Sequence, residues 1–148
     1  MASSGRRLRI DDMVGDRLGW DRLRGPDPSY RLEGATLTFE PGGQIEVSTD
    51  PVPSISGAID LALTSLEKVA AAIPGRAVFA GLDLWNGVST VPLQLRAPRY
   101  TAMDTYFGGL SSVGRVMMRH TCAVQLNLDG GAACSAGGSE WPKPSPPF

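Results

Sequence analysis

Apolar and polar positions alternate with a period of two across residues 35–49. The apolar positions of this stretch are Leu37, Phe39, Ile45 and Val47. The alternation is broken once, by residues 41–43 (Pro-Gly-Gly), and alternation about a glycine-containing turn is typical of a β-hairpin. Because successive side chains of a strand point to opposite faces, Glu40, Gln44 and Glu46 would share the polar face near the turn.

Residues 121–129 show the most regular alternation in the chain. One side carries Cys122, Val124, Leu126 and Leu128, and the other carries Thr121, Gln125, Asn127 and Asp129. This pattern predicts a strand with one buried face, in which Cys122 would be an inert core thiol. A shorter apolar run predicts a second buried strand over residues 77–82.

Helical spacing replaces the alternation over residues 55–73. Ser54 or Ser56 can cap a helix here, and residues 74–75 (Pro-Gly) end it. The apolar stripe of this helix, which we expect to pack in the core, is Ile59, Leu63, Leu66, Ala70 and Ile73.

A second helix is predicted from Pro98, because proline suits the first helical turn. This helix would run over about 98–107 and would be closed by Gly108 and Gly109. Residues 115–118 predict one further helical turn.

The two ends of the chain differ in composition from its middle. Residues 1–34 are polar and turn-rich, which predicts a loosely structured lead-in. Residues 130–148 hold four Gly and four Pro in 19 positions, so we expect a disordered tail. The whole chain has 148 residues, which corresponds to one domain.

Composition and charge exclude several function classes. Lys and Arg number 14 and Asp and Glu 15, a net charge of −1, so no basic excess attracts nucleic acid or anionic lipid. No run approaches the roughly 18 apolar residues of a membrane helix, and no apolar run follows the basic N-terminus as in a secretory signal. Two cysteines are too few for a disulfide scaffold, which favours a cytoplasmic protein.

Oxygen-bearing side chains on the two predicted polar faces indicate a divalent cation. Asn and Asp are depleted in strands, so a face of Gln125, Asn127 and Asp129 favours binding, although a half-solvated sheet face is the common alternative. Together with Glu40 and Glu46, the side-chain oxygens of Gln125 and Asn127 suit Mg²⁺. One His and two Cys are too few for an ordinary structural zinc site.

The usual nucleotide and nucleophile motifs are missing from the sequence. Neither Gly-x-x-x-x-Gly-Lys-Ser/Thr nor Gly-x-Gly-x-x-Gly occurs, and no Gly-x-Ser-x-Gly is present. The single histidine, His120, follows Arg119 and is interpreted as a surface or supporting residue rather than a general base.

Three strings, in order, resemble segments of the glutamate–cysteine ligases of plants and many bacteria. The segment Thr38-Phe-Glu-Pro-Gly-Gly-Gln-Ile-Glu-Val-Ser48 resembles Glu-Pro-Gly-Gly-Gln-x-Glu-Leu-Ser of that family. Pro98-Arg-Tyr-x-x-Met103 resembles its Arg-Tyr-x-x-Met helix start. Met117-Met-Arg-His-Thr-Cys-Ala-Val-Gln-Leu-Asn-Leu-Asp129 is similar to its Met-Met…Thr-x-x-Val-Gln-Val-Asn-Leu-Asp strand. The resemblance covers residues 35–129. Within the family, the sequence most resembles the actinobacterial branch that feeds ergothioneine synthesis.

This resemblance implies an α+β fold, part of a glutamine-synthetase-like catalytic domain in which helices pack on one face of an antiparallel sheet. It implies ATP-dependent joining of the γ-carboxylate of glutamate to the amine of cysteine through a γ-glutamyl phosphate. The product, γ-glutamylcysteine, would feed glutathione or ergothioneine synthesis. Mg²⁺ would be the cofactor, ATP the co-substrate, and glutamate and cysteine the small-molecule substrates.

The same resemblance assigns ligands for the cation and the nucleotide. Glu40 and Glu46 match metal-binding carboxylates of the family. Gln125 and Asn127 match a polar pair near the metal and the nucleotide.

Substrate-binding residues follow from the resemblance as well. Arg99 matches a catalytic arginine of the substrate pocket, where a guanidinium can hold a carboxylate by two hydrogen bonds. Arg119 and Thr121 are further substrate-binding candidates, and Gln44 is a candidate for supporting the turn.

The chain departs from the family pattern at both ends. The family begins its catalytic sheet with a Glu-x-Glu strand that nothing before residue 35 matches, and the residues after 129 differ too, so we expect a partial member. It would be either a ligase by descent or a non-catalytic fragment that at most binds Mg–ATP or a partner subunit. A relative that joins glutamate to another amine is a third hypothesis. For the isolated chain we expect no ligase turnover.

Overall fold

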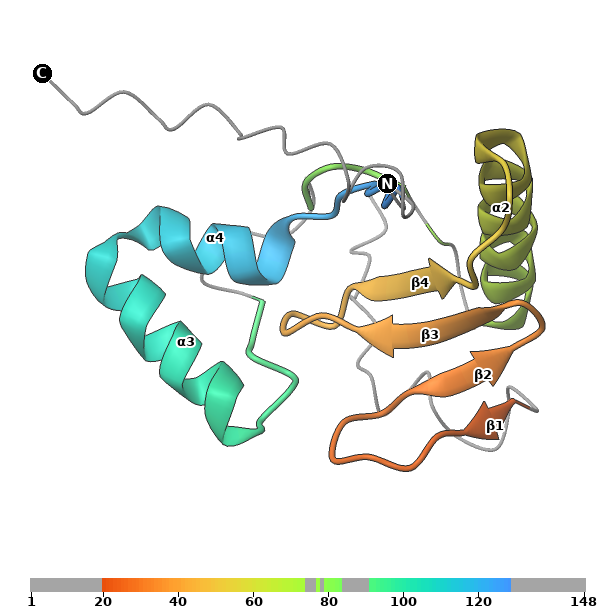
Figure 1. The fold of residues 1–148 in the computed structure, drawn as a ribbon. Coiled ribbons are helices and arrows are strands. Elements are labelled where there is room, and N and C mark those ends of the chain that lie inside the picture. Colours follow the sequence, from red (N-terminus) through yellow and green to blue (C-terminus); the bar gives the residue numbers. More distant parts are fainter. Residues whose placement is uncertain (1–19, 74–76, 78, 84–90, 129–148) are drawn as a thin grey trace, which may run out of the picture.

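The computed structural model describes residues 20–73, 77, 79–83 and 91–128 (Figure 1). The elements are β1 (Asp21–Arg22), β2 (Tyr30–Leu32), β3 (Ala35–Phe39), β4 (Ile45–Thr49), α2 (Ile55–Ala72), α3 (Pro98–Leu110) and α4 (Ser112–His120). The strands form one antiparallel sheet in the order β1-β2-β3-β4. The predicted α+β class is confirmed. None of the helices in the described part is long and apolar enough to cross a membrane.

The β3–β4 hairpin is the part that the alternation predicts best. Its register pairs Ala35 with Thr49 and Phe39 with Ile45, so the turn falls between residues 40 and 44. Leu37 and Phe39 are buried, as the period of two requires for one face of a strand. The hairpin predicted over residues 35–49 is therefore confirmed.

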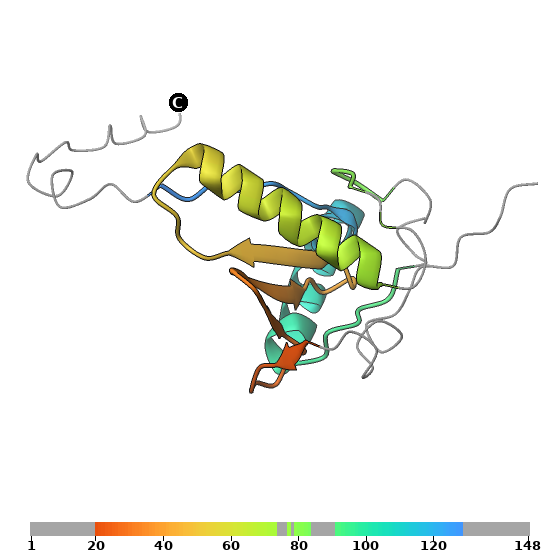
Figure 2. The same ribbon diagram turned by 90° about the vertical axis from the view of Figure 1, so that its right-hand side faces the viewer.

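The core lies between the sheet and α2 (Figure 2). Its buried members are Tyr30, Leu32, Ala35, Leu37, Phe39, Val69, Ile73 and Leu95. Ser54 caps α2 as predicted, since its side-chain oxygen accepts a hydrogen bond from the backbone N–H of Gly57 at 3.1 Å.

The side of α2 that faces the core differs from the predicted stripe. Ile59 and Leu63 are more than half exposed, whereas Ser65 and Val69 are buried. Ile73 is the one stripe residue that is buried as expected. At 3.6 residues per turn, the line through Ser65, Val69 and Ile73 lies roughly 80° around the helix from the centre of the expected stripe. The apolar residues of α2 cover a wide arc, and the sheet contacts one edge of that arc.

Helices α3 and α4 form a hairpin beside the β3–β4 turn, across the sheet from α2 (Figure 1). Pro98 opens α3 as expected, but Gly108 and Gly109 continue the helix, which ends at Leu110. The single helical turn expected over 115–118 is part of the longer α4. A Cβ on Gly114 would lie 2.4 Å from the carbonyl oxygen of Phe107, so the two helices meet where only glycine fits.

The predicted strands over 77–82 and 121–129 do not form in the described residues. One isolated antiparallel bridge joins Leu82 to Thr121, with the Cys122 N–H donating to the Gly81 carbonyl at 3.1 Å. Beyond the bridge, residues 122–128 pair with no strand of the described ranges, and Leu128 is 72% exposed. Cys122 is exposed, so its interpretation as a core thiol is wrong. An alternating pattern becomes a strand only where another backbone pairs with it.

The ends of the chain are described only in part. Residues 20–34, predicted as a loosely structured lead-in, contain β1 and β2, and Tyr30 and Leu32 belong to the core. That prediction is wrong for this stretch, because β2 forms by pairing with β3, which local composition does not indicate. Residues 1–19 and the tail at 130–148 lie outside the described residues, so the predicted tail stays a prediction.

Candidate functional site

The turn between β3 and β4 holds Glu40 at the edge of the polar face of the sheet. The backbone N–H of Gly43 donates to the Glu40 carbonyl at 2.8 Å, and the Glu40 N–H donates to the Gln44 carbonyl at 2.8 Å. Pro41 fits the first corner of such a three-residue loop, and Gly43 takes the left-handed φ of +83° that follows it. The Glu-Pro-Gly-Gly-Gln string is thus a turn sequence.

This turn packs directly against the end of α4. A Cβ on Gly42 would lie 2.2 Å from the Arg119 carbonyl oxygen, so no larger residue fits there. The Gln44 side chain is buried and donates to the Thr121 carbonyl at 3.0 Å, and Gln94 donates to the Gly42 carbonyl at 3.0 Å. Gln44 therefore supports the turn, and its predicted place on the open face beside Glu40 is wrong.

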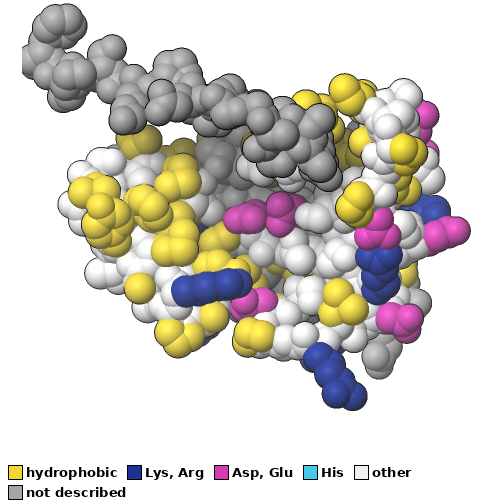
Figure 3. Space-filling view, viewed as in Figure 1, with side chains coloured by type: hydrophobic (Ala, Val, Ile, Leu, Met, Phe, Trp, Pro, Cys, Tyr) yellow, Lys and Arg dark blue, Asp and Glu magenta, His cyan; other side chains and the backbone are white. Residues whose placement is uncertain are grey.

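Two carboxylates meet on the open face of the β3–β4 hairpin. Thr38 and Glu46 are opposite each other in the register, and the Thr38 hydroxyl donates to the Glu46 carboxylate at 2.8 Å. Partial desolvation raises the pKa of the Glu40 carboxyl, and repulsion from the Glu46 carboxylate raises it further. Figure 3 shows acidic side chains in the middle of this face, between the sheet and the α3–α4 hairpin.

Tyr100 connects this acidic pair to Arg99. Burial is the largest cause of the raised pKa of the Tyr100 phenol, and the carboxylates of Asp27 and Glu40 raise it further while Arg99 opposes them. The Tyr100 ring packs against the core, and the Arg99 guanidinium carbon lies 4.4 Å from the centre of that ring. Arg99 also donates to the Tyr100 oxygen and, at 2.8 Å, to Asp27.

Arg119 and Thr121 are used inside the fold. Arg119 is mostly buried, forms an ion pair with Asp104 of α3, and donates to the Val91 carbonyl at 3.1 Å. The Thr121 hydroxyl donates to the Met117 carbonyl at 2.5 Å, which satisfies one free carbonyl at the end of α4. The substrate-binding role predicted for both stays a prediction.

Gln125 and Asn127 lie on the extended segment after the Leu82–Thr121 bridge. Both are exposed, and neither forms a hydrogen bond with Glu40 or Glu46 in the described part of the chain. The structure therefore brings Glu46 within electrostatic reach of Glu40 and holds Arg99 against Tyr100 and Asp27. Among the described residues, Arg99 makes no ion pair or hydrogen bond with either glutamate, and the amide pair lies apart from both groups. Their predicted role beside the metal and nucleotide stays a prediction.

His120 is the last residue of α4 and is only 2% exposed. Its interpretation as a surface residue is wrong. Its backbone carbonyl accepts from the Asp83 N–H at 2.9 Å, while its Nε2 atom has no hydrogen-bond partner among the described residues. Buried at the junction between α4 and the bridge, the ring supports the fold there.

The carboxylate pair fits a hard divalent cation. Burial is the larger cause of the raised pKa of Glu40, and the nearby Glu46 carboxylate adds to it. A bound cation would favour the charged form of Glu40 against both effects. Mg²⁺ commonly takes one or two carboxylates from a protein and completes its six oxygens with water and phosphate. No group of three or more His, Cys, Asp or Glu residues suited to a metal occurs in the described ranges, so a site built from protein ligands alone is not supported there.

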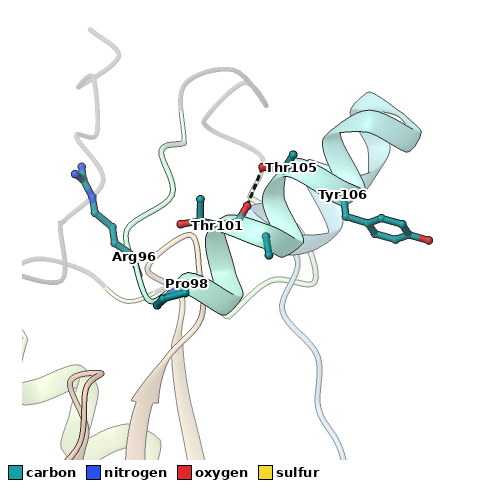
Figure 4. Close-up of a pocket in the computed structure, with 6 residues that line it drawn as sticks. Arg96, Pro98, Thr101, Thr105 and Tyr106 are labelled. Atoms are coloured by element: carbon teal, nitrogen blue, oxygen red, sulfur yellow. Dashed lines mark hydrogen bonds between the residues drawn. The ribbon is translucent and has the colours of Figure 1, made fainter.

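A shallow, mostly apolar groove runs along one side of α3 (Figure 4). It is lined by Arg96, Pro98, Thr101, Ala102, Thr105 and Tyr106. Figure 4 shows Arg96 and Tyr106 pointing away from each other, and the Thr105 hydroxyl donating to the Thr101 carbonyl at 3.0 Å. The polar groups of the groove do not converge, so it does not form a chemical site.

Sequence reasoning missed Asp27 and Tyr100. Asp27 lies between two prolines in the β1–β2 connection, and that surrounding indicates a turn rather than a site. Tyr100 directly follows Arg99 in the Arg-Tyr string, which was the one available signal. The contact between Asp27 and Arg99 spans 72 positions and follows only from the fold.

Comparison with known proteins gives one family match and a set of plant relatives. Glutamate-cysteine ligase family 2 (GCS2) matches residues 14–134, which begins earlier and ends later than the resemblance over 35–129. The chloroplastic glutamate–cysteine ligases of Nicotiana tabacum and Medicago truncatula are each 29% identical to this chain, over 121 and 122 residues. That of Arabidopsis thaliana is 27% identical over 122 residues.

Each of these alignments covers 78% of this chain but only 23%, 24% and 23% of the respective relative. The chain thus spans about a quarter of the length of the curated relatives it matches. The predicted tie to an actinobacterial, ergothioneine branch stays a prediction. The family match extends over most of the chain, including β1, β2 and the whole β3–β4 turn, and the chain belongs to glutamate-cysteine ligase family 2.

Proposed function

We propose that this chain supplies the metal-binding hairpin and a substrate arginine of an ATP-dependent glutamate–cysteine ligase. In the proposed reaction, an oxygen of the glutamate γ-carboxylate attacks the γ-phosphorus of ATP, and ADP leaves. The cysteine amine then attacks the acyl carbon of the γ-glutamyl phosphate, loses a proton and displaces phosphate. Family membership and the placement of Glu40, Glu46 and Arg99 support this proposal.

The observation that carries the proposal is the pair of like charges held on an open sheet face. Glu40 is positioned by the β3–β4 turn, which packs against the end of α4. Glu46 is positioned by the hydrogen bond that it accepts from Thr38. Repulsion between two fixed carboxylates costs free energy unless a cation is bound.

The residues would act by positioning and charge neutralisation, which dominate catalysis of phosphoryl transfer. Glu40 and Glu46 would hold Mg²⁺, which when bound supplies positive charge against the phosphate oxygens. Thr38 keeps one Glu46 oxygen oriented. Arg99, at the start of α3 and in contact with Tyr100, would hold a carboxylate of glutamate.

Several finer points belong to the same proposal. The proposal that cysteine supplies the amine rests on the names of the relatives. An assay that compares several amines would distinguish this reaction from the joining of glutamate to another amine. The cytoplasm is the proposed location. Because the chain spans about a quarter of those relatives, ligand binding is the first property to test in it.

The test is binding of Mn²⁺, a paramagnetic substitute for Mg²⁺, to the 148-residue chain, followed by NMR line broadening. Broadening should centre on the backbone signals of residues 38–46, and Mg²⁺ should reverse it. Glu40→Gln and Glu46→Gln should each weaken Mn²⁺ binding by about tenfold or more, since each removes one charged ligand. Glu67→Gln, on the exposed side of α2, is the matched control and should change nothing.

Broadening that is spread over all acidic residues alike, or that survives both substitutions, would refute the proposed site. Release of ADP that requires glutamate and rises with cysteine is the corresponding assay of turnover. We expect no turnover from the isolated chain. Turnover that vanishes in Glu40→Ala would overturn that expectation while supporting the assigned reaction.

A further inference from the structure

The guanidinium of Arg99 is held in place although its side chain is exposed. The side chain of Arg99 is 66% exposed, whereas that of its partner Asp27 is only 21% exposed. One nitrogen, Nη2, donates to Asp27 Oδ2 at 2.8 Å and also to the Tyr100 oxygen. The guanidinium carbon lies 4.4 Å from the centre of the Tyr100 ring. The Tyr100 oxygen, the Tyr100 ring and the Asp27 carboxylate thus restrain the guanidinium end of the flexible Arg99 side chain.

The other donors of the guanidinium stay available. Arg99 Nε and Nη1 make no hydrogen bond to any residue in the described ranges, and two of the five N–H donors of a guanidinium are enough to hold a carboxylate. An exposed arginine normally loses rotamer freedom when it binds a ligand, and prior restraint lowers that cost. The Asp27 contact therefore prepares Arg99 for a ligand without using all its donors.

The position of Asp27 is set by the connection between β1 and β2. The Leu23 N–H donates to the Ser29 carbonyl at 2.9 Å, which closes this connection around Asp27. Prolines on both sides of Asp27 restrict its backbone. A restricted loop can hold a carboxylate against the start of α3, 72 positions further along the chain.

We propose that Asp27 and Tyr100 are positioning residues that hold Arg99 at the start of α3, so that its remaining donors can bind the carboxylate of an amino-acid substrate. This inference rests on the proposed function and extends it to two residues that do not themselves bind the metal. Asp27 neutralises part of the charge of Arg99, and Tyr100 carries the guanidinium on its ring face and oxygen.

A matched pair elsewhere on the sheet provides the control. Arg31 on β2 forms an ion pair with Asp50 and donates to it at 2.8 Å through Nη1. This pair has the same chemistry, although Asp50 is 42% exposed where Asp27 is 21% exposed. No aromatic ring lies beneath the Arg31 guanidinium in the described part of the chain. Asp50→Asn should therefore release an arginine in the same way as Asp27→Asn, at a place that the inference does not connect to substrate.

The experiment measures L-glutamate and Mn²⁺ affinity of the 148-residue chain by NMR titration, with the Arg99 Nε–Hε signal assigned through Arg99→Lys. Asp27→Asn should weaken glutamate binding by about two- to tenfold, the cost of restraining one long side chain, and leave Mn²⁺ affinity unchanged. Asp27→Glu, which keeps the carboxylate, should recover part of the loss. Tyr100→Phe keeps the ring and removes the oxygen, so its loss should be smaller. Asp50→Asn should match wild type for both ligands.

Each outcome decides one point. Unchanged or tighter glutamate binding in Asp27→Asn overturns the positioning role while the metal site stands. Mn²⁺ binding without any glutamate binding in wild type also overturns it, because Arg99 then holds no substrate carboxylate. If wild type binds neither Mn²⁺ nor glutamate, the proposed function is refuted. In that case ¹⁵N relaxation of Arg99 Nε still tests whether Asp27 restrains the Arg99 side chain. Equal Arg99 mobility in wild type and Asp27→Asn would show that Asp27 does not hold it.

Discussion

Replacing Gly42 with alanine tests whether the β3–β4 turn is shaped by its contact with α4. The added Cβ would lie 2.2 Å from the carbonyl oxygen and 2.7 Å from the Cα of Arg119, both of which are backbone atoms. Backbone atoms at a helix end cannot rotate away as a side chain can, so the turn has to move. Movement of the turn stretches the hydrogen bond from Gln44 to the Thr121 carbonyl.

The expected loss of stability follows from these two contributions. Forcing an extra methyl group into a packed contact costs about 1–3 kcal/mol. Weakening one buried hydrogen bond adds about 1 kcal/mol. Gly42→Ala should therefore lower the free energy of unfolding by about 2–4 kcal/mol. The same displacement moves Glu40, the first residue of the turn, so Mn²⁺ affinity should fall as well.

Gly109→Ala is the matched control, because nothing lies within 4 Å of a Cβ placed there in α3. Alanine is favoured over glycine in a helix, so this variant should be more stable by about 0.5–1 kcal/mol. Urea unfolding followed by circular dichroism gives both values, provided the dependence on urea stays the same. If Gly42→Ala unfolds within about 0.5 kcal/mol of wild type, the packing argument for this turn is refuted.

Three further predictions concern charge and exposed apolar surface. Folding raises the pKa of Glu40, so the folded chain binds the Glu40 proton more tightly than the unfolded chain does. Protonated Glu40 therefore stabilises the fold at low pH, and this stabilisation is lost as the pH rises from the unfolded-state pKa of about 4.3 through the higher folded-state pKa. Glu40→Gln should remove that dependence in urea unfolding between pH 4 and 7, and an identical profile would contradict it. Asp104→Asn breaks the mostly buried pair with Arg119 and should cost about 2–4 kcal/mol in the same assay, whereas no loss would mean that the pair is not structural. Leu126→Lys should reduce self-association in sedimentation velocity, because Leu126 is half exposed on an unpaired extended segment, and unchanged association would point to another surface.

Local pattern is enough to predict the β3–β4 hairpin and the start of each long helix. The period of two over residues 35–49 and the glycines at its turn act between neighbours, so a reader of the sequence has all the information needed. The capping of α2 by Ser54 and the opening of α3 by Pro98 are also short-range effects. That Glu40 and Glu46 lie close together could be predicted for the same reason, since both residues belong to one hairpin, while their role as metal ligands stays a prediction.

Features that depend on distant segments were beyond the reach of the pattern. The buried side of α2 is chosen by the sheet, so the apolar arc alone placed Ile59 in the core although it is more than half exposed. The alternation over 121–129 describes what a strand would bury, but pairing needs a partner backbone, and only Thr121 has one in the described residues. The restraint on Arg99 comes from a loop 72 positions away.

One junction connects these local and distant contributions. The turn that carries Glu40 contacts the end of α4 through Gly42, and the Arg119 side chain next to that contact ties α4 to α3 through Asp104. Arg99 begins α3, so the metal-binding candidate and the substrate-binding candidate are anchored to the same pair of helices. A change that loosens Arg119 should therefore displace Glu40 and Arg99 relative to each other.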